Sequence, residues 1–508
     1  MQDLIELIQV VSHEKLEAIR RNKGWSNKKS KLMEFYNKIA DGDFPDDDTA
    51  ARELYNADKQ APAYKKLRKT LKDELISALF LIDLKQPSFT DRQLAYYGCH
   101  KEWAAAKILF AKNARHVAVG IATKLLKFAR KYEFTELIID ICHLLRIYHG
   151  TNDGNIQRFQ QYNLELKNAQ KNAGIESRAI ELYLELSIHS IHSKASKETF
   201  LEQAKAYFEE LKPALQQNSS YLLHLYGRLL EAYIFACVND HAQVIEVAQR
   251  AIAFFKTKDY TASVPLLAFH YQIAVSACQQ NNLPLAQESL QQCFLYAQEE
   301  SYNWYKLQEL LCIVNMHQHQ PFQVFNQWKN IRNSFNYEHL PAHLQEFWRI
   351  VEAYLVLLGR LNQLPDQLIT KNEHLAHFKI GRFVNDVPLS SKDKKGLNIH
   401  VLILEMMFNL VNLDFDHLSN RIDAINKYRN RYLQSSDLQR SDCFFRFLLS
   451  LPKIIFDRTA LLRKQRETIA KLSLMPHAYS TQSAEMEIVP YETLAVHLIH
   501  TLSHASSN

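Results

Sequence analysis

Glycine and proline are scarce in this sequence, whose 508 residues include only 11 glycines and 13 prolines. No two glycines stand at the spacing of a GxGxxG fingerprint or of a Walker phosphate loop, which excludes nucleotide binding through either motif. The HExxH, GxSxG and protein-kinase motifs are missing as well. No Pro/Gly/Ser-rich linker divides the chain, so the composition favours a continuous helical protein over domains on flexible tethers.

Long apolar runs and paired cysteines are also missing. The run at 401–411 falls short of the ~20 residues that a membrane helix needs, and the N-terminus MQDLIELIQVV has no basic segment of a secretory signal. The seven cysteines form no CxxC pair, which indicates reduced residues inside helix cores. A net charge of +6, from 61 basic and 55 acidic residues, is too small to imply nucleic-acid binding. We therefore expect a cytoplasmic protein with no membrane contact.

A pair of helices joined by a short turn recurs between residues 221 and 361. The apolar periodicity predicts helices at 221–238, 241–255, 263–280, 283–299, 304–319, 321–335 and 340–361. Breaks at Asn239-Asp240 and Asn281-Asn282 lie 42 positions apart, which is a spacing typical of solenoid repeats.

Apolar and small residues in this block resemble the signature of the tetratricopeptide repeat. The matching positions are Ile273, Ala274, Ala277, Leu283, Ala286, Leu290 and Cys293, echoed one repeat earlier by Ala232, Phe235, Val244, Ala248 and Ala251. The resemblance implies an all-α fold, a right-handed α-solenoid of antiparallel helix pairs. Asn239 or Asn281 stands where that family usually has glycine, and the period exceeds 34 residues, so HEAT-like pairs and an ordinary helical domain stay open.

Three phrases of the chain resemble a family of large bacterial helical-repeat proteins with no established activity. They are GRFVNDVPLSSKDKKGLN, RYLQSSDLQRSDCFFRFLLSLPK and QSAEMEIVPYETL. We expect three regions: a short-helix N-terminal region at 1–83, tetratricopeptide-like repeats at 84–361, and a helical C-terminal region at 362–508. Residues 378–396 lack helical periodicity and are predicted to form a long loop within the last region.

The leading functional hypothesis is a non-enzymatic scaffold or adaptor that binds a protein or peptide in a groove lined by the first helix of each repeat. In the register above, the groove carries Tyr226, Leu229, Tyr233, Tyr271 and Val275. These aromatic and aliphatic side chains suit an apolar partner helix or extended segment. No cofactor is expected, and an enzyme with an unrecognised site is the remaining alternative.

The alternative hypothesis is a DNA-associated regulator. Segments 49–55 and 63–82 have the order of a helix-turn-helix, and Lys65, Arg68, Lys69 and Lys72 lie along one flank of the second segment. The same helix has a strong apolar stripe and needs a polar face opposite it, so a solvated or partner-facing surface explains these cations better than DNA contact does.

Two clusters suggest metal ligands without the pattern of a site, and no metal is predicted. Asp41, Asp43, Asp46, Asp47 and Asp48 lack the spacing of an EF-hand loop and suit a helix N-terminus instead. His497, His500 and His504 share one helical face, but no acid or cysteine is placed to complete a zinc site.

Overall fold

The computed structural model describes residues 1–11, 31–79, 91–192, 200–334, 337, 340–386, 397–433, 438–475 and 487–505. Every regular element in these ranges is a helix, and neighbouring helices pack in pairs, which confirms the all-α class. No helix in this part of the chain is long and apolar enough to cross a membrane. The chain divides into two compact units, Met1–Lys171 and Asn172–Asn508. The predicted division at 83/84 and 361/362 stays a prediction.

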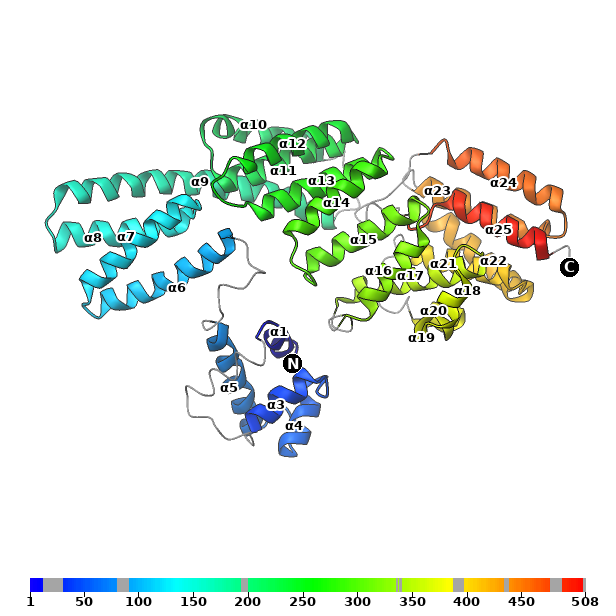
Figure 1. The fold of residues 1–508 in the computed structure, drawn as a ribbon, viewed down its shortest axis with the longest axis horizontal. Coiled ribbons are helices and arrows are strands. Elements are labelled where there is room, and N and C mark those ends of the chain that lie inside the picture. Colours follow the sequence, from blue (N-terminus) through cyan, green and yellow to red (C-terminus); the bar gives the residue numbers. More distant parts are fainter. Residues whose placement is uncertain are drawn as a thin grey trace. The chain divides into compact units, whose positions relative to one another are not determined.

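The first unit begins with four helices around one small core (Figure 1): α1 (Gln2–Val10), α3 (Lys31–Ala40), α4 (Asp47–Tyr55) and α5 (Pro62–Leu79). Phe35 and Tyr64 meet edge to face in this core, with ring centroids 5.7 Å apart. Asp46 accepts a hydrogen bond from the amide of Thr49 and caps α4, as its place before the helix predicted. The next helices pack in succession: α6 (Asp91–Ala111), α7 (Arg115–Lys131) and α8 (Thr135–Thr151).

The sequence pattern around Gly174 predicts two separate helices, at 156–173 and 177–193, but the structure has a single helix there, α9 (Ile156–His192). A β-carbon at Gly174 would meet no atom within 4 Å, and one glycine in a helix costs only about 1 kcal/mol relative to alanine. Glu176, 5 % exposed, accepts a hydrogen bond from the hydroxyl of Ser220. Tertiary packing therefore carries the helix past the glycine.

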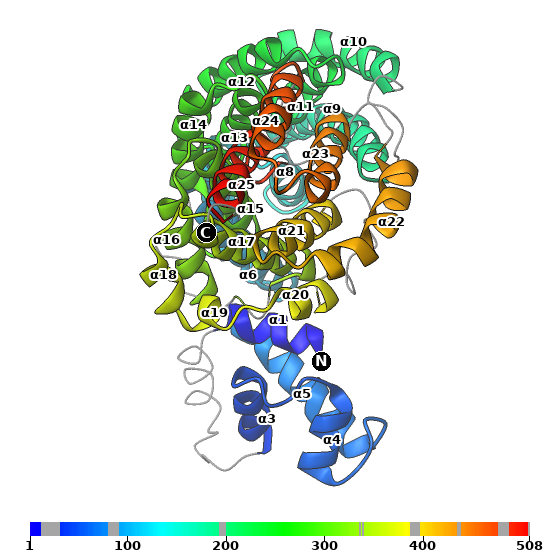
Figure 2. The ribbon, with the colours of Figure 1, turned by 90° about the vertical axis from the view of Figure 1, so that its right-hand side faces the viewer.

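The central block of the second unit forms the predicted helices, each within three residues of its expected ends. They are α11 (Tyr221–Cys237), α12 (His241–Lys256), α13 (Ser263–Gln279), α14 (Leu283–Tyr296), α15 (Tyr302–His317), α16 (Pro321–Arg332) and α17 (Ala342–Arg360), and α10 (Leu201–Gln217) precedes them. Figure 2 shows α11, α13 and α15 on the inner side of a curve and α12, α14 and α16 on its outer side.

The helices that follow α17 vary widely in length, from 4 residues in α19 to 18 residues in α22. They are α18 (Asp366–Thr370), α19 (Glu373–Ala376), α20 (Ile380–Asp386), α21 (Leu397–Val411), α22 (Phe415–Tyr432), α23 (Gln439–Ser450), a 3₁₀ turn (Leu451–Lys453), α24 (Arg458–Leu472) and α25 (Tyr491–Ala505). Helix α20 shows that the loop predicted at 378–396 was wrong for its first part, because the ring of Phe378 stacks on Phe408 and Phe383 is buried. Residues 387–396 lie outside the described ranges.

One turn geometry closes the odd-numbered helices of the block and α21. A residue with positive φ follows each helix end, at Asn239, Asn281, His319, Asn362 and Leu413. The next amide donates to a carbonyl five positions back, for example Asp240 N to Phe235 O at 3.0 Å and Gln320 N to Asn315 O at 2.9 Å. This is the bonding pattern of the Schellman motif, in which asparagine is one of the few residues to replace glycine. Because the turn is the same each time, residues at the same distance before its positive-φ residue occupy equivalent positions on these helices.

Candidate functional site

Residues on the inner helices α11, α13, α15 and α17 are equivalent when they stand the same number of positions before the positive-φ residue of the turn that follows. Ten positions before it stand Leu229, Tyr271 and Glu309 on α11, α13 and α15. Six positions before it stand Tyr233, Val275, Ile313 and Val356 on α11, α13, α15 and α17. Four of the five residues predicted to bind a partner therefore occupy two equivalent positions in successive repeats.

All five predicted partner-binding residues are half-buried. Tyr226 and Tyr233 pack against the core of α9, α10 and α11, and the ring centroids of Tyr183 and Tyr226 lie 5.6 Å apart. Tyr271 and Val275 pack against the larger core that starts at α13. The five residues thus lie on two neighbouring inner helices, α11 and α13, and the hydrophobic core against which their side chains pack differs between the two helices. We call these five residues the open face.

The same positions are covered in the later helices. Ile313 on α15 is fully buried and Val356 on α17 is 4 % exposed, whereas their equivalents Tyr233 and Val275 keep part of their surface in solvent. Glu309, the equivalent of Tyr271, is only 1 % exposed. Helix α17 also packs against α18, α19 and α21, in addition to its preceding neighbour α16.

The C-terminal segment contacts the later helices of the array. The imidazole Nε2 of His317, near the end of α15, lies 2.7 Å from the backbone carbonyl oxygen of Glu487. Helices α23 and α25 both pack against α21, which in turn packs against α17. The end of α15 is therefore in contact with the C-terminal segment and α17 with α21, while the equivalent positions of α11 and α13 keep part of their surface in solvent.

A buried ion pair holds the C-terminal segment in place. Arg440 on α23 is 1 % exposed, and its guanidinium donates to both carboxylate oxygens of Glu487, at 2.7 and 3.0 Å. It also donates to the carboxylate of Glu492 and to the carbonyl oxygen of Leu472. Glu487 accepts a further bond from the amide of Tyr491 at the start of α25. One guanidinium thus serves two carboxylates: Glu487 is fully buried and hydrogen-bonded, as a buried charge requires, and Glu492 is 21 % exposed.

No family model, curated protein or solved structure matches this chain. The resemblance to tetratricopeptide repeats and to the bacterial helical-repeat family therefore stays a prediction from the residues. Function has to be argued from the chemistry of the surfaces.

Charge beside the open face is compensated within the protein. Glu231 on α11 is 8 % exposed and accepts from the guanidinium groups of Arg228 and Arg250, at 2.6 and 3.0 Å. The open face is consequently aromatic and aliphatic, with its nearest carboxylate already neutralised.

Glu309 is buried, whereas the residues at the equivalent position in α11 and α13, Leu229 and Tyr271, are half-buried. The ammonium of Lys306 donates to its Oε2 at 2.7 Å, while its Oε1 has no hydrogen-bond partner in the described part of the chain. Burial raises the pKa of this carboxyl to about 7, and the ammonium of Lys306 only partly opposes the rise. Sequence periodicity gave no sign of this group, because a glutamate at an inner position looks like any other polar residue.

The basic flank of α5 is partly engaged by carboxylates of its own unit. Arg68 donates to Asp47 at 2.9 Å and to Asp3 at 2.5 Å, and Lys72 donates to Asp3 at 2.8 Å. Lys65 and Lys69 are exposed. The cations do share one flank, but two of them stabilise the packing of α1 and α4 on α5. DNA contact through them stays a prediction.

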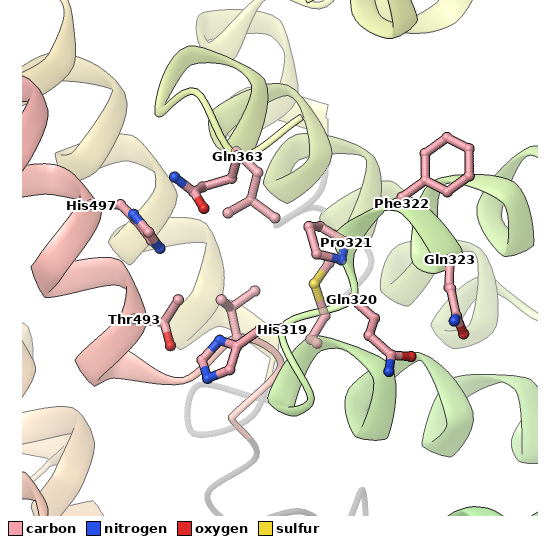
Figure 3. A pocket seen from close by; sticks show the side chains of 11 residues that line it. His319, Gln320, Pro321, Phe322, Gln323, Gln363, Thr493 and His497 are labelled. Carbon is pink, nitrogen blue, oxygen red and sulfur yellow. The ribbon is translucent and has the colours of Figure 1, made fainter. Parts of the chain in front are cut away.

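A cavity of about 640 Å³ lies among the α15–α16 turn, the α17–α18 turn and the start of α25 (Figure 3). His319, Gln363 and His497 are among the residues that line it. The described residues contain no group of three or more His, Cys, Asp or Glu able to hold a metal ion. His497 is half-buried and His500 exposed, and the side chain of His504 lies outside the described residues.

Proposed function

We propose that this protein is a non-enzymatic scaffold that binds a protein or peptide partner through the open face. In this proposal the helix pairs form a right-handed, tetratricopeptide-like solenoid. Its inner surface is available at α11 and α13 and filled by the chain's own C-terminal segment further along.

One observation carries the proposal: equivalent positions are half-exposed in α11 and α13 but buried in α15 and α17. The protein itself shows that this side of the array accommodates packed segments, since Glu487 is bound against α15. Tyrosine suits such a surface because its ring gives a large apolar contact and its hydroxyl a polar one. Covering a fully exposed large apolar side chain is worth about 1.5–3 kcal/mol, so a few half-exposed ones are enough for a specific contact.

The proposal is tested by purifying the tagged protein from its own cells at low salt and quantifying the proteins that co-elute. Changing Tyr233→Ala and Tyr271→Ala together is expected to release a stoichiometric partner. Leu295→Ala is the matched control, because Leu295 is 71 % exposed and lies on α14, an outer helix. A partner retained equally by the double variant would overturn the assignment of the open face. Recovery of nuclease-sensitive nucleic acid, without protein, would favour the basic flank of α5 instead.

A further inference from the structure

The cavity between the α15–α16 turn, the α17–α18 turn and α25 has an unusual set of polar groups. His319, Gln320 and Gln363 come from the two turns, and Thr493 and His497 come from α25. None of the described lining residues is acidic, and none is a lysine or arginine. No open-face residue lines it, so its chemistry is separate from the partner binding proposed above.

His319 occupies the positive-φ position of its turn, with φ at 57°. The equivalent residue is asparagine in the other central turns, at 239, 281 and 362. Asparagine and histidine are both among the residues that tolerate this backbone conformation, so the turn accepts either side chain. The imidazole appears at one of the two turns that line the cavity with α25; the other, at Asn362, contributes Gln363.

The two imidazoles lie on the same side of the cavity. Figure 3 shows the ring of His319 beside Thr493, one helical turn along α25 from His497. Burial lowers the pKa of His497, and the imidazoles of His319 and His500 lower it further. Positive charge on one ring therefore disfavours positive charge on the others, and no carboxylate among the lining residues relieves the repulsion.

Gln320 adds a polar group without an internal role. It precedes α16, yet its side chain makes no capping hydrogen bond to that helix. Its buried Oε1 has no hydrogen-bond partner among the described residues. This oxygen is closed to solvent, so Gln320 lines the cavity with the rest of its side chain.

We propose that this cavity binds a small anion carrying a carboxylate or phosphate group, held between the imidazoles of His319 and His497. Hydrogen bonds from protonated imidazoles to an anion are charge-assisted and therefore strong. A bound anion supplies the negative charge that the lining lacks, so binding is accompanied by proton uptake at His497. The hydroxyl of Thr493, which lies beside the ring of His319 in Figure 3, adds a further polar contact on the same side of the cavity.

The test is calorimetric titration of the full-length protein with inorganic phosphate and, separately, with succinate, at about pH 6 and about pH 8. At least one of the two anions is expected to bind, about tenfold more tightly at the lower pH. His319→Asn and His497→Gln should each weaken that binding about tenfold or more. His319→Asn installs the residue that the neighbouring turns use, so it leaves the fold intact. His377→Asn, at an exposed histidine of the same unit, is the control and should bind as the unchanged protein does.

Binding of phosphate alone or of succinate alone supports the site and identifies the group that it accepts. Failure of the unchanged protein to bind either anion overturns the proposal, as does unchanged affinity in both His319→Asn and His497→Gln. Circular dichroism of each variant establishes that it is folded, and if one variant unfolds, the other decides. Partner release by the open-face variants is measured independently, so either proposal can fail alone.

Discussion

The imidazole of His317 donates a 2.7 Å hydrogen bond to the backbone carbonyl oxygen of Glu487, a residue 170 positions later in the chain. A carbonyl oxygen can only accept, so the Nε2 atom of His317 carries a hydrogen. The side chain of Glu487 is bound by the buried guanidinium of Arg440. One residue thus joins α15, α23 and the start of α25, and makes the C-terminal segment part of the helical array.

Replacing Arg440 tests this connection. Arg440→Met leaves Glu487 buried without its cation, which is expected to cost about 3–5 kcal/mol and to speed amide exchange in α25 more than in α11. Arg446→Met is the matched control on the same helix, because Arg446 is 60 % exposed and its pair with Asp442 is worth about 1 kcal/mol or less. Denaturant unfolding and hydrogen exchange measure both. Equal effects of the two changes would contradict a role for the buried pair.

Glu309 predicts a pH-dependent stability. Burial raises its pKa from an ordinary value of 4.5 to about 7, so the folded state favours the protonated carboxyl. The corresponding stability is fully present below pH 4.5 and is lost as the pH rises to about 7, by roughly 3 kcal/mol. Glu309→Gln should remove this dependence and stabilise the protein at pH values above 7. The measurement is the unfolding free energy across this pH window, with a change at the exposed Glu288, Glu288→Gln, as the control. If Glu309→Gln leaves the pH profile unaltered, the buried carboxyl is not the source of the pH dependence.

The asparagines of the recurring turn are expected to be there for backbone conformation. Asn239 has φ at 56°, where glycine is unstrained and a β-branched side chain is not. Asn239→Gly should change the unfolding free energy by at most a few tenths of a kcal/mol, while Asn239→Val should cost about 1–2 kcal/mol. Thermal unfolding of the two variants gives the comparison. Tolerance of valine would show that the turn is not held by its backbone bonds.

Asp47 gives the first unit its own sensitivity to acid. Burial opposes its ionisation, but hydrogen bonds from the Met1 ammonium, Tyr64 and Arg68 outweigh burial and lower the pKa of Asp47 from 3.8 to about 2. Its contribution to stability is therefore present above pH 3.8 and disappears as the pH falls to about 2.

Asp47→Asn should destabilise the packing of α5 at neutral pH and flatten the acid-unfolding curve between these values. Asp48→Asn is the control, since Asp48 is 45 % exposed and pairs with Lys59 at the surface. Hydrogen exchange of α5 amides follows both variants. Faster exchange in Asp48→Asn than in Asp47→Asn would count against the account.

Local signals explain why the central helices were predictable. The turns at Asn239 and Asn281 combine a residue that accepts positive φ with a following Asp or Asn that caps the next helix, and both features are visible within a few positions. The apolar periodicity between such turns then sets the helix ends. Gly174 shows the limit of the same reasoning, because the packing of neighbouring helices overrides a local break.

The covered half of the inner surface was not predictable in this way. Whether Ile313 is buried or exposed depends on segments far away in the chain, and the sequence contains no local sign that Glu487 meets His317 or Arg440. The cavity has the same origin, since His319 and His497 come together only after the C-terminal segment has docked. Periodicity identifies which face of a helix is apolar; the partner of that face is a tertiary property.

The central claim is that a partner binds the inner side of α11 and α13. Its most direct measurement is site-specific photocrosslinking in the protein's own cells, with a benzoylphenylalanine placed in turn at positions 233, 271 and 295. The account predicts that positions 233 and 271 crosslink to one and the same protein, and that the exposed outer position 295 does not. Crosslinking of that protein from position 295 alone, or from none of the three while it still co-purifies, would contradict the account.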